Sequence, residues 1–124
     1  MKKFSKLGLM RKADQAFAKY IKKKYEIDGT VICVTCGTTQ TIANIQAGHY
    51  IVRAKQATRY DERNVHPQCL ICNVFRHGEL PKYALYLIKT YGPTVLEELE
   101  KESRKLVKTN VVYYQAIIEK YSKV

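Results

Sequence analysis

Hydrophobic side chains recur every three or four residues near the start of the chain, which is the spacing of an amphipathic helix. Basic residues fill many of the positions between them. Asp28 and Gly29 then signal a turn, and the β-branched run 30–32 predicts the start of a strand. The first part of the chain, residues 1–28, is therefore predicted to be one helix. Its apolar face comprises Leu9, Ala13, Ala16, Phe17, Tyr20 and Ile21.

Helical spacing returns in the last part of the chain, residues 81–124. Pro81 suits the first turn of a helix that Gly92 ends. A second helix is predicted to open at Pro93, and Thr109 or Asn110 can cap a third. We expect these helices to be scaffold. The positions predicted to face inward are Ala84, Leu87, Ile88 and Tyr91, then Leu96, Leu99, Leu106 and Val107, then Val111, Tyr114, Ile117, Ile118 and Tyr121.

The centre, residues 29–80, contains all four cysteines and all three histidines. The cysteines form two Cys-x-x-Cys units, and two such turns can complete a tetrahedral zinc site. Four cysteine ligands leave no open coordination position, so this zinc is predicted to be structural. A redox pair and two buried apolar pairs are the alternatives, but no βαβ context for a redox pair is evident. The four predicted zinc ligands are Cys33, Cys36, Cys69 and Cys72.

The length and net charge of the chain limit which classes of function are expected. A chain of 124 residues has room for one domain, 1–124, of mixed α+β type. Its net charge of +11 favours a polyanionic partner, nucleic acid above all. A ribosome-associated or simply soluble basic protein is the alternative. No run of eighteen apolar residues occurs, so we expect no membrane contact and a cytoplasmic location, where disulfides are unusual.

Three polar residues stand between and just after the cysteine pairs in a suggestive order. His49 lies between the pairs, Asn64 stands five residues before Cys69, and Asn73 directly follows Cys72. This order resembles the HNH motif of zinc-bearing nucleases, and also phage recombination endonuclease VII. The closer resemblance, over residues 12–78, is to the NinG/Rap recombination nucleases of lambda-like bacteriophages. The matching segments are 12–20, 33–38, 47–50 and 61–73.

The resemblance implies a zinc-braced ββα-metal (HNH) centre flanked by helices. It implies a metal-dependent DNA endonuclease acting on branched recombination intermediates, such as Holliday junctions, D-loops and forks. In that interpretation His49 is the general base and Asn73 offers its oxygen to Mg²⁺ or Mn²⁺. Asn64 would tie the loop backbone so that His49 points at the phosphate.

Two positions depart from the HNH pattern. Many relatives have a metal-binding Asp where Gly48 stands, and the last His of the motif is Asn73 here. Another ligand for the catalytic ion must then come from elsewhere, with His49 itself and His77 as candidates. His66, Asp61 and Glu62 remain open as well, although His66 is predicted to pack against the cysteine turns and the two acids can be ordinary turn residues.

Basic side chains near the motif are predicted to contact DNA phosphates, although scattered charges are often only a solvated surface. Junction cleavage needs two symmetric nicks, so we expect a homodimer. A non-catalytic zinc-ribbon adaptor and an HNH nuclease of linear duplex DNA are the rival interpretations. The five predicted phosphate contacts are Arg53, Lys55, Arg59, Arg63 and Arg76.

Overall fold

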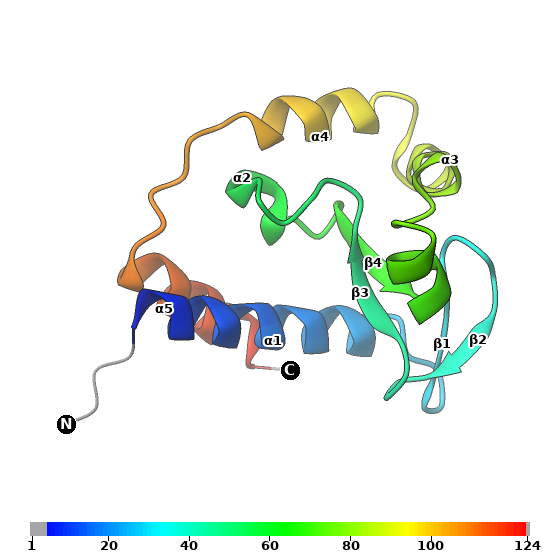
Figure 1. Cartoon of the computed structure of the whole chain (residues 1–124), viewed down its shortest axis with the longest axis horizontal. Coiled ribbons are helices and arrows are strands. Elements are labelled where there is room, and N and C mark those ends of the chain that lie inside the picture. The colour runs from blue at the N-terminus through cyan, green and yellow to red at the C-terminus, as the bar shows by residue number, and fades with distance from the viewer. Residues whose placement is uncertain (1–4, 124) are drawn as a thin grey trace.

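A computed structural model describes residues 5–123 as a mixed α+β fold with two small sheets (Figure 1). The first four residues and the last residue of the predicted domain lie outside the described residues. No described helix is both long and apolar enough to cross a membrane. In chain order the elements are α1 (Lys6–Lys24), β1 (Thr30–Ile32), β2 (Thr39–Thr41), β3 (Gln46–His49), α2 (Gln56–Arg59), β4 (Val65–Gln68), the π-helical turn η1 (Ile71–Phe75), α3 (Leu80–Tyr91), α4 (Val95–Ser103) and α5 (Val111–Tyr121).

The predicted N-terminal helix is present as α1, which ends at Lys24, four residues before the predicted end. The Ser5 hydroxyl caps it by accepting a hydrogen bond from the Gly8 amide at 2.9 Å. One face of α1 is buried, as the spacing predicted, and α5 packs along it (Figure 1). Tyr114 and Tyr121 of α5 join Phe17 in the main core. These two helices, far apart in sequence, therefore form the base of the molecule.

Two antiparallel strand pairs make up the β-structure. Strand β1 begins at Thr30, as predicted, and pairs with β2. Strand β3 pairs with β4 so that His49 lies opposite Val65 and Gly48 opposite His66. Alternation along the strands turns Ala47 and Val65 toward the core against α1. Directly after β4 the chain enters η1, so the β3–β4 pair and η1 form one continuous unit.

The C-terminal helices confirm some expectations and correct others. Pro81 lies in the first turn of α3, Gly92 ends it, and the Asn110 side chain caps α5 through the Tyr113 amide. Helix α4 stops at Ser103, whose hydroxyl donates to the Glu100 carbonyl and so competes with helix continuation. Leu106 consequently lies in an irregular connection and is fully exposed, which contradicts its predicted inward position. Val111, at the first turn of α5, is exposed too.

Candidate functional site

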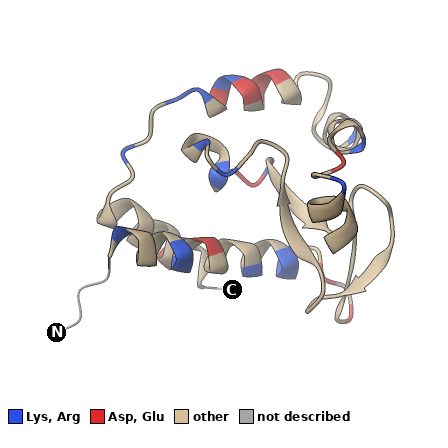
Figure 2. Cartoon of the chain, in the orientation of Figure 1, with Lys and Arg blue, Asp and Glu red and all other residues tan. Residues whose placement is uncertain are grey.

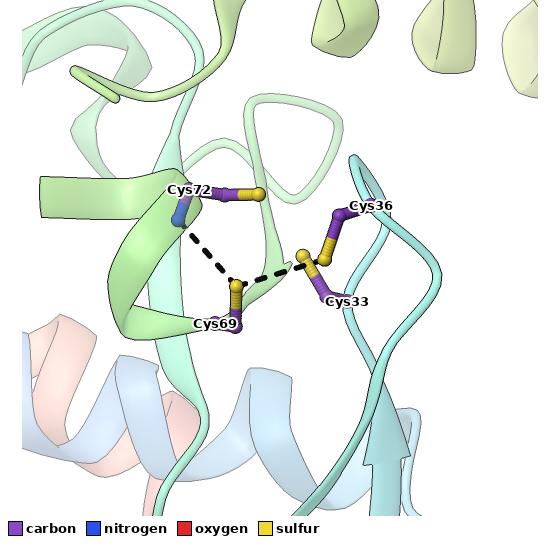
Figure 3. Close-up of side chains that lie close together, drawn as sticks. All are labelled: Cys33, Cys36, Cys69 and Cys72. Atoms are coloured by element: carbon purple, nitrogen blue, oxygen red, sulfur yellow. Dashed lines mark hydrogen bonds between the residues drawn. The ribbon is translucent and has the colours of Figure 1, made fainter. Parts of the chain in front are cut away.

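Four cysteine sulfurs converge where the turn after β1 meets the start of η1 (Figure 3). The four Sγ atoms all lie within 4.8 Å of one another, and Cys36 Sγ is 3.7 Å from Cys69 Sγ. Zn–S bonds of about 2.3 Å in a tetrahedron require sulfur separations of roughly 3.8 Å. The site can therefore hold a zinc ion, as the spacing predicted. Within residues 5–123, no other group of three or more His, Cys, Asp and Glu side chains gathers in this way.

The surroundings of Cys33 and Cys72 shift the pKa values of these two thiols in opposite directions. Although burial acts to raise it, hydrogen bonds from Thr35 and from nearby backbone amides lower the pKa of Cys33 to about 6. Burial raises the pKa of Cys72 to about 12, so this thiol needs a bound cation in order to ionise. Gly37 adopts a φ of 79° and lets the first turn close, with its amide donating to the Cys33 carbonyl at 2.9 Å.

A pocket of about 520 Å³ opens beside this site, between α1, β3 and η1. His49 and Asn73, which sequence analysis paired, both line it. Asn64 does not line it and is instead completely buried behind the loop that follows β3. Three further polar residues that sequence analysis did not single out also line the pocket: Asp14, Lys22 and Gln46.

His49 is held by one backbone group. Its Nε2 lies 2.9 Å from the Arg59 carbonyl oxygen, which can only accept, so Nε2 carries the proton. Burial lowers the pKa of His49 to about 4, and the positive charges of Arg53 and Arg59 act in the same direction. The ring is therefore neutral near pH 7, and the Nδ1 lone pair is the one that can accept a proton.

Arg59 is itself fixed by Asp14 of α1. Its Nε donates to Asp14 Oδ1 at 2.9 Å, its Nη2 donates to Asp14 Oδ2, and its Nη1 reaches the Arg53 carbonyl at 2.9 Å. The Tyr60 hydroxyl donates to the same carboxylate at 2.8 Å. Arg59 is thus buried, and each of its three guanidinium nitrogens donates within the protein, which corrects the prediction that it contacts DNA phosphates. It positions the backbone that holds His49.

Asn64 ties this loop together through both ends of its amide. Its Oδ1 accepts from the Ile51 amide at 2.8 Å, and its Nδ2 donates to the carbonyls of Ile51 and Thr58 at 3.0 and 3.1 Å. Thr58 immediately precedes Arg59, and Ile51 follows His49 by two residues. Asn64 therefore joins the two backbone segments on either side of the His49–Arg59 hydrogen bond.

Asn73 enters the pocket from η1. Its Nδ2 donates to Gln46 Oε1 at 2.8 Å, so the amide is oriented and its Oδ1 is the atom that can accept a hydrogen bond or bind a cation. Gln46 had no motif to mark it. The only signal in the sequence is its place three residues before His49 on the same strand.

Gly48 has a packing reason to lack a side chain. A Cβ at this position would lie 1.8 Å from Gln68 Oε1. Gln68 is locked in place, since its Nε2 donates to the Gly78 carbonyl at 2.8 Å and to Thr35 Oγ1 at 3.1 Å. The Asp found here in many HNH proteins does not fit while Gln68 occupies this space.

The other predicted ligands for a catalytic ion lie outside the pocket. Glu62 accepts from the Tyr20 hydroxyl and from Lys24, and Asp61 accepts from the Arg63 amide. His77 is exposed and does not line the pocket, so the structure does not bring it together with His49 and Asn73. His66 is structural, as expected, although tyrosines surround it more than the cysteine turns do.

His66 belongs to a buried hydrogen-bond chain between α3 and β3. The Tyr83 hydroxyl donates to the Gly48 carbonyl at 2.7 Å, so the His66 Nδ1, 3.2 Å away, donates to the Tyr83 oxygen. His66 Nε2 then accepts from the Tyr91 hydroxyl at 2.7 Å. Burial lowers the pKa of His66 to about 4, in keeping with this neutral form. The chain fixes the peptide that directly precedes His49.

The remaining predicted phosphate contacts differ in exposure. Arg53 lines the pocket with a mostly exposed side chain, and Lys55 is exposed nearby. Arg76, just after η1, is half exposed and lies 4.0 Å from Glu79. Arg63 lies between Asp61 and Glu98 and is only partly exposed. The cations that border the pocket are therefore Arg53 and Lys22, with Arg76 beside η1.

These features define a small α+β protein built around a four-cysteine site that can hold zinc. The family is shown by comparison with known proteins: residues 2–124 match the family described as Bacteriophage Lambda NinG protein, and the chain belongs to this family. The predicted NinG resemblance is thereby confirmed.

Curated relatives agree with this assignment. The ninG protein of Salmonella phage P22 is 35% identical over 97 residues, and that of Escherichia phage lambda is 34% identical over the same length. Each alignment covers 77% of this chain and 46% of the relative, so the chain spans about half the length of these proteins. No solved structure matches the chain.

Proposed function

We propose that this chain is a metal-dependent DNA endonuclease of the HNH type that cuts branched DNA. The observation that carries the proposal is a single pocket lined by both a partly buried, neutral His49 and an oriented Asn73. The β3–β4 pair followed by η1 supports assigning this unit as the ββα centre. A zinc-ribbon adaptor has no need for a histidine held neutral in a polar pocket.

The residues divide the work of phosphodiester hydrolysis. His49 Nδ1 takes a proton from the water that attacks phosphorus, while the Arg59 carbonyl stabilises the positive charge that the ring acquires. Asn73 Oδ1 would hold one Mg²⁺ or Mn²⁺, with waters completing its shell, and this ion would stabilise negative charge on the phosphate and leaving oxygen. The four cysteines would hold a structural zinc that fixes η1, and with it Asn73.

A site in which Asn73 is the one protein ligand is consistent with Mg²⁺ or Mn²⁺ as the proposed ion. Mg²⁺ usually retains several waters and shares its shell with substrate phosphates. The pocket contains one carboxylate, Asp14, whose two oxygens are already bonded by Arg59 and Tyr60. We therefore infer that the ion enters together with DNA, through Asn73 and the scissile phosphate.

The test compares a four-way junction, a fork and a linear duplex of matching sequence, each incubated with zinc-loaded protein and Mg²⁺ or Mn²⁺. We expect nicking only with the added ion, and faster on the branched molecules. Binding without any nicking would support the adaptor, and equal rates on all three would support a nuclease of linear duplex DNA. Sedimentation of the protein–junction complex measures whether two chains bind one junction, as the expected homodimer requires.

A further inference from the structure

The turn η1 and the residue directly before it expose four large apolar side chains on one edge. Leu70, Ile71, Val74 and Phe75 are all solvent-exposed, and Phe75 retains 70% of its accessible surface. We call these four residues the η1 edge. Exposed apolar side chains in a contiguous group commonly mark a binding surface.

Local geometry explains why these four share an edge. The Arg76 amide donates to the Ile71 carbonyl at 2.8 Å, the wide i to i+5 bond of a π-turn. In such a turn, residues four and five apart lie on the same side. Cys72, on the opposite side, is completely buried at the metal site and so turns the edge outward.

The η1 edge borders the proposed active site. Val74 lines the pocket that contains His49 and Asn73, while Leu70 and Ile71 line a neighbouring hollow. Lys22 and Gln46 line both hollows, so the two lie along one face. Arg76 lines the second hollow and Arg53 the first, which places cations on both sides of the edge.

We propose that the η1 edge receives unpaired bases of a DNA branch, with Phe75 stacking on one of them. An unpaired nucleotide presents an apolar ring face and an anionic phosphate, and the edge offers an aromatic ring flanked by cations. In a linear duplex the base faces are hidden by stacking, so the contact is available only at a branch or a melted end. This inference rests on the proposed function, because it makes the η1 edge the surface that selects branched DNA over linear duplex.

The experiment measures binding without added Mg²⁺ or Mn²⁺, so that it does not depend on cleavage. Zinc-loaded protein is titrated against a fork and a linear duplex of the same sequence, with 2-aminopurine at the unpaired position of the fork. We compare Phe75→Ala, Phe75→Tyr and Val112→Ala. Val112, on α5, is 71% exposed and serves as a matched apolar control.

We expect Phe75→Ala to lower fork affinity by roughly tenfold, with little effect on the duplex, and to abolish the change in 2-aminopurine fluorescence. Phe75→Tyr keeps the ring and should retain both signals, as should Val112→Ala. An equal loss on fork and duplex, or no fork preference in the parent protein, overturns the stacking proposal. If the parent protein prefers forks but never nicks them, the nuclease proposal fails while the stacking proposal stands.

Discussion

The chemistry proposed for His49 depends on which ring nitrogen carries the proton, and the Arg59 carbonyl determines this. Behind that carbonyl stand Asp14, which fixes the Arg59 side chain, and Asn64, which fixes the backbone on either side. A substitution of Asp14 or Asn64 is therefore expected to slow the proposed reaction by displacing His49, although neither residue is proposed to contact DNA.

The protonation of His49 and His66 gives a pH-dependent prediction. Both pKa values, about 4 in the folded protein, lie below the ordinary value of about 6.5. These residues therefore stabilise the folded state above pH 6.5, and this contribution is lost as the pH falls from about 6.5 through 4. NMR titration of the imidazole signals should show both rings neutral at pH 6. Titration of either ring near pH 6.5 would contradict this.

A second residue-scale prediction separates positioning from phosphate contact. Arg59→Lys keeps the charge but cannot make the paired bonds to Asp14 together with the bond to the Arg53 carbonyl. We expect its single-turnover nicking rate to fall at least tenfold while its DNA affinity and salt dependence stay near those of the parent protein. Because this variant can also lose stability, its unfolding is followed in parallel at the assay temperature. Normal nicking with weakened binding would restore the phosphate-contact role.

At the scale of elements, the cysteine turns join two parts of the fold that lie far apart in the sequence. The small β1–β2 pair and η1 meet at the sulfurs, with Val31 and Ile45 as the remaining members of that core (Figure 3). Such a small apolar cluster stabilises little by burial alone, so the metal is expected to supply much of the local stability.

Removing one ligand tests this dependence. Cys36 is the exposed cysteine of the four, so Cys36→Ser leaves core packing almost intact while it weakens the zinc site. We expect less than one zinc per chain, lower solubility and a cooperative loss of structure at lower temperature. Metal analysis beside thermal unfolding measures both. Full stability in a zinc-free variant would show that the turns fold without the ion.

The sequence predicted those elements that are specified by residues close together in the chain. Helix α1 follows from its apolar period, α3 from Pro81 and Gly92, and the cysteine site from two Cys-x-x-Cys units. Leu106 was misplaced because apolar spacing does not reveal that a helix has already ended at Ser103. The roles of Asp14 and Gln46 depend on contacts with residues 45 and 27 positions away, and no spacing rule reports those.

At the scale of the whole molecule, charge is unevenly distributed (Figure 2). Helix α1 contains seven Lys and Arg residues with Asp14 as its only acid, whereas α4 contains four of the eleven acidic residues in the chain. The pocket opens against α1. A DNA backbone is therefore expected to approach from the α1 side and to avoid α4.

Salt dependence tests this direction of approach. Arg53→Ala and Arg76→Ala should each weaken binding and reduce the slope of log affinity against log salt by about 1. Arg104, exposed and paired with Glu100 at the end of α4, is the matched control, and Arg104→Ala should leave the slope unchanged. Equal effects of all three substitutions would mean that DNA contacts the protein without a preferred face.

The most direct measurement of the central claim is single-turnover cleavage of a four-way junction by His49→Ala, set beside a gel-shift titration. His77→Asn is the control, because His77 is exposed outside the pocket and Asn tolerates its φ of 52°. We predict that His49→Ala cuts about 10²–10⁴-fold more slowly with unchanged affinity, and that His77→Asn cuts at the parent rate. Cleavage by His49→Ala at the parent rate would contradict the proposed active site.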